Sequence, residues 1–374
     1  MSYLFFAFLA SALMLLYRRP PSATSPLWNI VGGGPGVPRR LTAAGSVTLS
    51  RVGLLLSASV LLTVAATRYG IGTDYWSRHV PMFIQIRNGW RTDYEPGFIA
   101  LNLIVGYFTD DPQWLIALLS LLTIALVYRF IVRMSLNPAL SVLLFVLGGF
   151  YLETFNLAQQ GLAIALLLNT IELALRRKHL AFVLVVLVAT SIHSSALIWF
   201  AVWPLLMIRL NRFWRTMAAI GATALILGAS QLLIAWAARI APDYAWYLTS
   251  NYGDARNISL GVILCAFAAA VPFMLRATPA GEGDYSGALA NLLLIGALLL
   301  VTAITSAYFF SRLVYYFTPV QMVAIPYLLA TIRSAVTRRI IGSAYVVLYL
   351  SAFVYQFIVW NAHGVVPYES VLFQ

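Results

Sequence analysis

Long apolar runs dominate the chain and are separated by short polar stretches. An apolar run of about 20 residues can cross a bilayer as a helix. The runs are continuous and rich in Leu, Ala and Val, whereas the strands of a transmembrane barrel alternate over about ten residues. The pattern therefore predicts about ten membrane-spanning helices, at residues 3–17, 51–68, 113–132, 139–152, 155–175, 216–238, 258–275, 287–309, 312–331 and 340–360.

Two further apolar stretches do not match ordinary spans. Residues 96–108 are too short to cross, so we expect a re-entrant segment that returns to the side it came from. Residues 180–208 are too long for one span and are interrupted by a polar stretch, Thr190 to Ser195, that contains His193. We expect this stretch to form a broken, His-containing hairpin of two half or full spans.

Composition supports a membrane protein. The chain has 374 residues, of which 61% are hydrophobic and only 10% charged, too few to cover the surface of a soluble domain of this length. The expected fold class is all-α, a polytopic transmembrane helix bundle that forms a single domain over residues 1–374. Within it, residues 18–50 are expected to form a cytoplasmic Pro/Gly-rich linker, and residues 69–112 an outer-face loop with the re-entrant segment.

The net charge of +12 helps to orient the spans, because cytoplasmic loops are enriched in Lys and Arg. In the first apolar run the charge comes after the run, at Arg18 and Arg19, whereas a cleaved signal peptide carries its charge before it. We therefore expect a retained first helix with its N-terminus outside. The single cysteine, Cys265, excludes an internal disulfide and a cysteine metal cluster. The basic clusters expected in the cytoplasm are Arg18/Arg19/Arg39/Arg40/Arg51, Arg129/Arg133, Arg176/Arg177/Lys178, Arg209/Arg212/Arg215, Arg276 and Arg333/Arg338/Arg339.

Four arginines lie on the outer side in this topology, against the usual charge bias. They are Arg68, Arg78, Arg87 and Arg91. Arginine binds phosphate through a planar fork of donors and keeps its charge, so these residues are candidates for binding an anionic substrate. The alternative is that they form loop ion pairs with nearby carboxylates, namely Asp74, Asp93 and Glu95.

Further polar groups fall on the same side of the predicted bundle. Ionisable side chains at membrane depth are costly and usually functional, which draws attention to His193 and Arg312. The alternatives are that His193 caps a helix end inside the bundle and that Arg312 extends to the lipid headgroups. The other outer residues are Asn156, Gln159 and Gln160, which can also serve as hydrogen-bonding links between helices, then Tyr315 and Tyr316, and the C-terminal residues 361–370.

Six short motifs occur in order along most of the chain. Together they resemble the EpsG family of Wzy-like bacterial polysaccharide polymerases. One position departs from that family, which usually has Arg-Gln where this chain has Gln159-Gln160, so Gln159 cannot supply a charge to a phosphate. The motifs are Gly72-Thr73-Asp74-Tyr75, Glu95-Pro96-Gly97-Phe98, Asn156-x-x-Gln159-Gln160-x-x-Ala163, Ile192-His193-Ser194-Ser195-Ala196-Leu197, Arg312-x-x-x-Tyr316-Phe317 and Pro367-Tyr368.

The resemblance implies a GT-C-like glycosyltransferase of the bacterial cytoplasmic membrane, with its active face towards the periplasm or exterior. Such an enzyme joins oligosaccharide repeat units carried on polyprenyl diphosphate and releases polyprenyl diphosphate. The implied partners are the lipid-linked donor and acceptor, the bilayer, and other proteins of polysaccharide export or chain-length control. It implies no cofactor and no nucleic acid.

This reaction assigns candidate roles to the outer residues. The leaving diphosphate requires positive charge that is already in place, and the acceptor hydroxyl requires a general base or an orienting acceptor. Glu95 and His193 are the first candidates for the base, with Asp74 behind them. Partial withdrawal from water is expected to raise the pKa of Glu95. The candidates for binding substrate and diphosphate are Arg312, Arg78, Arg87, Arg91, Arg256, Asn156, Gln159, Gln160, Tyr315 and Tyr316.

Other activities remain open at the level of sequence. A metal site is not expected, since the only acidic triplet of the relevant kind is Asp93-Tyr94-Glu95. A lipid-linked glycan ligase would use the same donor and the same arginines. A membrane O-acyltransferase also uses an intramembrane histidine, but that histidine is expected near the cytoplasmic face. A transporter of lipid-linked oligosaccharides usually has matching broken helices in both halves, and the second half offers no partner for the 180–208 hairpin.

Overall fold

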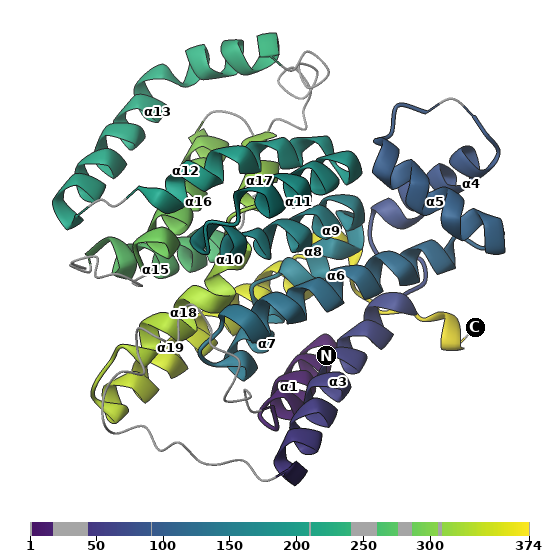
Figure 1. The fold of residues 1–374 in the computed structure, drawn as a ribbon, viewed down its shortest axis with the longest axis horizontal. Helices are drawn as coiled ribbons and strands as arrows, with labels where there is room; N and C mark the ends of the chain where they lie inside the picture. Colours follow the sequence, from purple (N-terminus) through teal and green to yellow (C-terminus); the bar gives the residue numbers. More distant parts are fainter. Residues whose placement is uncertain are drawn as a thin grey trace.

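The computed structural model describes residues 2–17, 44–90, 92–208, 211–240, 260–275, 286–305 and 309–373, and the regular structure in these residues is helical (Figure 1). The all-α prediction is therefore confirmed for this part of the chain. Residues 18–43 of the expected linker lie outside the described residues, and the next helix, α3, begins at Ala44.

Six segments within the described residues are long and apolar enough to cross a membrane, and a bent pair of helices brings the number to seven. The bent pair is α7 (Pro138–Leu147) with α8 (Phe150–Asn156), which meet at 46°. The six segments are Leu49–Ala66 in α3 (Ala44–Ala66), Gln113–Met134 (α6), Ala158–Leu175 (α9, Ala158–Leu168, with α10, Thr170–Leu175), Ser286–Ile304 in α16 (Ser286–Thr305), Phe310–Ala330 (α17, Phe309–Val314, through α18, Gln321–Ala330) and Ala335–Val359 (α19, Ala335–Phe353, with η7, Val354–Val359).

These seven segments correspond to seven of the predicted spans, but the total of about ten is not confirmed. The remaining three predicted spans correspond to shorter apolar helical stretches of 10–17 residues each in the described part of the chain. They belong to α1 (Ser2–Met14), α13 (Arg212–Ile240) and α15 (Leu260–Leu275).

Helices break where the sequence interrupts its apolar runs. α11 (His179–Ile192) ends just before His193, whose backbone is extended, and η2 (Ser194–Ala201) and α12 (Val202–Met207) follow. η2 packs back against α11, as expected for the predicted hairpin. The predicted segment 96–108 is α5 (Pro96–Phe108), which begins with proline at its first position. Between α7 and α8, Gly149 adopts the left-handed conformation (φ +86°), and a Cβ there would lie 3.1 Å from the Phe357 ring.

The helices pack around one large apolar core that extends from Tyr3 in α1 to Val365 near the C-terminus. In Figure 1, α1 and α3 lie alongside each other at one edge of the bundle, and α13 lies at the opposite edge. The helices α4 (Val80–Arg87) and α5 form a small lobe that projects at one end and has its own apolar cluster with α6 and α9.

The C-terminal segment returns to the end of α3. The Tyr69 amide donates to the Glu369 carbonyl (3.1 Å), and the Val371 amide donates to the Thr67 carbonyl (2.9 Å). This short pairing brings the last residues of the chain beside residues 67–74, which the sequence placed on the same side of the membrane. The structure therefore gathers the outer loop and the C-terminal segment at one end of the bundle.

A buried carboxylate joins α6 to α10 at the end of the bundle opposite to the C-terminal segment. Glu172, with its side chain 5% exposed, binds Arg133 on α6 (Nε to Oε2, 2.9 Å) and Arg176 one turn later (2.9 Å). No role for Glu172 was predicted from the sequence. We expect Glu172→Gln to lower the free energy of unfolding by about 1–2 kcal/mol, because it leaves two half-exposed arginines without their counter-charge. Thermal unfolding in detergent measures this, with exposed Glu369→Gln as the matched control. Equal midpoints for the two variants would contradict it.

Candidate functional site

The start of α9 connects several of the predicted site residues. The side-chain Nε2 of Gln159 donates to Glu95 Oε2 (2.5 Å) and to the Ile192 carbonyl (2.6 Å). The side-chain Nε2 of the neighbouring Gln160 donates to the Arg312 carbonyl (2.8 Å). The two glutamines are buried, so these hydrogen bonds fix α5, the end of α11 and α17 against α9.

Asn156, at the end of α8, makes a second set of links. Its Oδ1 accepts from the Asp74 amide (3.2 Å), and its Nδ2 donates to the His363 carbonyl (3.2 Å). The Asp74 carboxylate itself accepts only a long hydrogen bond from Thr73 Oγ1 (3.3 Å) among the described residues. Asp74 is thus held through its backbone, and its carboxylate is left available for a ligand.

Glu95 and His193 form a carboxylate–imidazole pair. Glu95 caps α5 in an extended conformation (φ −66°, ψ 144°), which the following proline favours. Its Oε1 lies 3.4 Å from His193 Nδ1 and accepts from the Ser194 amide (2.7 Å). The side chains of Glu95 and His193 are 20% and 17% exposed, respectively. A carboxylate on one ring nitrogen orients an imidazole so that the other nitrogen can transfer a proton.

The expected rise in the pKa of Glu95 is wrong. Burial does raise the pKa of this carboxyl, but the interaction with the His193 ring and the hydrogen bond from the Ser194 amide lower it to about 2. The sequence could suggest the burial but not the hydrogen bonds that stabilise the charged form. Glu95 is therefore a stable carboxylate and a weak base, which suits it to orienting His193.

α17 lies beside this pair. The hydroxyls of Tyr316 and Ser195 are 2.8 Å apart, which joins the residues just after α17 to the start of η2 after His193. The Arg312 side chain is partly exposed, and its guanidinium has no hydrogen bond or ion pair in the described part of the chain. An arginine at the edge of such a network can bind an anion with its full set of donors.

The arginines predicted on the outer side have different surroundings in the structure. Arg68 is buried: it donates to the Ala65 carbonyl (2.5 Å) and Ser120 Oγ (3.0 Å) and lies 4.6 Å from the Phe155 ring centroid. Arg87 pairs with Asp110, and the alternative pairing with Asp74, Asp93 or Glu95 does not form among the described arginines. Arg78 is exposed. Arg91 and Arg256 lie outside the described residues.

Comparison with known proteins identifies a family for this chain. The model of the EpsG family matches residues 52–370, which include Asp74, Glu95, His193 and Arg312. The chain belongs to the EpsG family. A search of curated proteins and a search of solved structures each found no match. Family membership indicates a membrane protein with an exopolysaccharide polymerase-like role, consistent with a glycosyltransferase.

This EpsG protein has a second carboxylate–imidazole pair, which the sequence did not reveal. Glu153 on α8 is buried, and its Oε2 lies 2.9 Å from Nε2 of His363 in η8 (Ala362–Gly364). The charge of Glu153 raises the pKa of His363. The available signal was weak, because Glu153 stands alone near the end of a span and its partner lies more than half the chain away.

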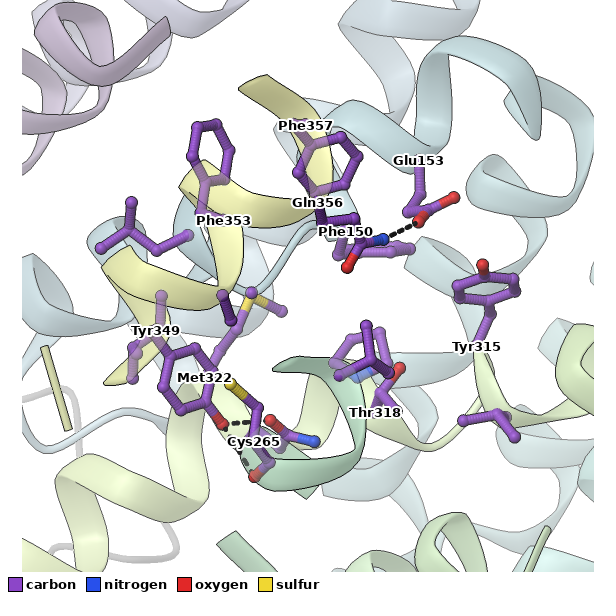
Figure 2. Close-up of a pocket in the computed structure, with 18 residues that line it drawn as sticks. Phe150, Glu153, Cys265, Tyr315, Thr318, Met322, Tyr349, Phe353, Gln356 and Phe357 are labelled. Carbon is purple, nitrogen blue, oxygen red and sulfur yellow. Dashed lines mark hydrogen bonds between the residues drawn. The ribbon is translucent and has the colours of Figure 1, made fainter. Parts of the chain in front are cut away.

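Glu153 also lines a cavity at the helix breaks of the EpsG fold. The cavity has a volume of about 60 Å³, enough for a few water molecules. Figure 2 shows Glu153 hydrogen-bonded to Gln356 at one end, with Tyr315 facing the same region and Tyr349 near Cys265 at the other end. The polar end of the cavity therefore lies next to α17, which carries Arg312.

His79 is another buried histidine that the sequence did not single out. Its Nε2 lies 3.1 Å from the Phe155 carbonyl, and burial together with the charge of Arg68 lowers its pKa to about 4. It is thus neutral at ordinary pH and, with Arg68, supports the segment below Asp74. Among the described residues, no group of three or more His, Cys, Asp or Glu side chains is placed to hold a metal ion.

Proposed function

We propose that this EpsG protein polymerises an exopolysaccharide on the outer face of the bacterial cytoplasmic membrane. The growing glycan is transferred from its polyprenyl diphosphate to a hydroxyl of the next lipid-linked repeat unit, and polyprenyl diphosphate is released. The observation that carries this proposal is the Glu95–His193 pair, which lies at the same end of the bundle as Asp74 and Arg312. The number of about ten membrane crossings and the GT-C-like fold remain predictions.

His193 serves as the general base in this proposal. Its Nε2, which has no protein partner among the described residues, accepts the proton of the acceptor hydroxyl as the oxygen attacks the anomeric carbon. The bond between that carbon and the diphosphate oxygen breaks, and the electron pair leaves with the diphosphate. Glu95 holds the ring and stabilises the imidazolium that forms.

Arg312 provides the principal charge for the leaving diphosphate. Its guanidinium, without a partner among the described residues, offers the fork of donors that phosphate oxygens require. Gln159, which stands where the family usually has arginine, is a neutral side chain bound to Glu95, so it cannot replace Arg312 in this role. Arg78 is exposed on the preceding loop and is available to a more distant phosphate or sugar acid. Tyr316 and Gln160 hold the segment of α17 in place through hydrogen bonds to Ser195 and to the Arg312 carbonyl, and Tyr315 lines the cavity beside Glu153.

Product analysis tests the activity. Purified protein in membranes is incubated with the host's intact polyprenyl diphosphate-linked repeat unit, with and without EDTA, and the glycans are separated on a gel. We expect a ladder spaced by one repeat that EDTA does not change, because the proposed chemistry uses His193 and Arg312 instead of a metal ion. Loss of the ladder in EDTA would contradict the metal-independent mechanism. Transfer of a single glycan to another acceptor, with no ladder, would indicate a ligase.

A further inference from the structure

The turn at residues 361–364 is held in an unusual conformation. Asn361 (φ +47°), His363 (φ +68°) and Gly364 (φ +63°) all adopt left-handed backbone geometry. Glycine adopts this region freely and asparagine tolerates it, whereas it is uncommon for other residues, so the surrounding contacts must maintain the conformation at His363. Strained backbone of this kind is found at sites where a precise arrangement is needed.

The strained turn holds the loop that carries Asp74. The His363 carbonyl accepts from the Thr73 amide (3.0 Å), and the Gly364 carbonyl accepts from the Gly72 amide (3.1 Å). Asn156 reinforces the contact, because it binds both the His363 carbonyl and the Asp74 amide. The fit is tight: a Cβ on Gly72, which has φ +96°, would lie 2.4 Å from Asn156 Oδ1.

The side chain of His363 ties this turn to the bundle. Its Nε2 binds the buried Glu153 carboxylate at 2.9 Å, and Glu153 is fixed in turn by Gln356 (3.4 Å) on η7. Burial excludes water from Glu153, so the ion pair is less screened than a surface pair. The Glu153–His363 pair is thus the only ion pair in the described part of the chain that links the C-terminal turn to a membrane helix.

We propose that Asp74 binds hydroxyl groups of the acceptor sugar and that His363, clamped by Glu153, is the positioning residue that presents it. This inference rests on the proposed function and deepens it by giving the acceptor its own subsite. The Asp74 carboxylate is half-buried and keeps an oxygen without a partner among the described residues, and a carboxylate accepts hydrogen bonds from hydroxyl groups.

The clamp depends on the charge of His363. The charged groups that face its ring are Glu153 on α8, Asp74 before η1 (Tyr75–His79) and Arg312 on α17. The Glu153 charge raises the pKa of His363, so the ion pair forms below that pKa and is lost as the pH rises through it. Acceptor binding in the wild type is therefore expected to weaken on the alkaline side.

Binding of an acceptor-only probe tests the inference apart from polymerisation. The probe is the repeat unit with a non-cleavable alkyl group at its reducing end, and calorimetry measures its affinity for the full-length protein in detergent. We expect Asp74→Asn, Glu153→Gln and His363→Asn to weaken binding about ten- to a hundredfold, the range for a lost hydrogen bond to a charged group. Asparagine is chosen at position 363 because it tolerates left-handed backbone.

Further variants distinguish a positioning role of His363 from a general loss of structure. Glu153→Gln should abolish the loss of probe affinity that the wild type shows at alkaline pH. His179→Asn changes an exposed histidine at the start of α11, away from this turn, and should bind the probe as the wild type does. Gly72→Ala should weaken binding without changing any charge. Wild-type affinity and pH dependence in both Glu153→Gln and His363→Asn would overturn the inference even if polymerisation is observed. Probe binding with this pattern, but no ladder from an intact donor, would sustain the subsite and overturn the polymerase.

Discussion

Replacing His193 with glutamine is expected to lower the rate of polymerisation by about 10²- to 10⁴-fold, the contribution typical of a general base. Glutamine retains a polar side chain of similar size at the end of α11 but cannot accept a proton from the acceptor hydroxyl. The polar contact of the His193 ring in the described part of the chain is with Glu95, which also accepts hydrogen bonds from the Gln159 side chain and the Ser194 amide, so the bundle should remain folded. Initial rates of ladder growth, normalised to the amount of protein in the membrane, measure the effect.

Two companion variants identify the base. His179→Gln changes the histidine at the opposite, exposed end of the same helix and should leave the rate unchanged. Glu95→Gln removes the charge that orients His193 and should reduce the rate less than His193→Gln does, and the double variant should be no slower than His193→Gln alone. A larger loss in Glu95→Gln than in His193→Gln would make Glu95 the base and refute the assignment.

Replacing Arg312 with glutamine should reduce the turnover number by about 10²- to 10³-fold, as the loss of a preorganised donor to a developing negative charge does in other enzymes. The guanidinium has no ion-pair partner among the described residues, so its removal strands no buried carboxylate and should cost little stability. Arg312→Lys should recover part of the rate, because lysine restores the charge but not the planar fork. Release of polyprenyl diphosphate from the donor measures the step directly.

The matched control for Arg312 is Arg338→Gln. Arg338 is exposed in the first turn of α19 and has no role in the proposed site, so this variant should release diphosphate at the wild-type rate. Equal rates for Arg312→Gln and the wild type would refute the assignment of Arg312 and direct attention to Arg78 on the outer loop.

Local features of the sequence were sufficient for most of the helical framework. A continuous apolar run must form a helix in a bilayer, because its backbone groups can bond only to one another there. This constraint predicts α6, the α9–α10 segment and the α19–η7 segment within about five residues of their observed ends. The sequence also predicted the start of α5 at Pro96 and the helix break at His193, because proline and polar residues change the conformation of the adjacent backbone.

Tertiary structure decided the chemistry of the site. The sequence named Glu95 and His193 as candidates and placed them on one side of the membrane, but the packing of α5 against α11 brought them together and made Glu95 a stable carboxylate. It also buried Arg68 and paired Glu153 with His363. Helix formation depends on neighbouring residues, which the sequence displays directly. Side-chain pairing and pKa depend on distance and burial in the folded bundle, which bring together residues that are remote along the chain.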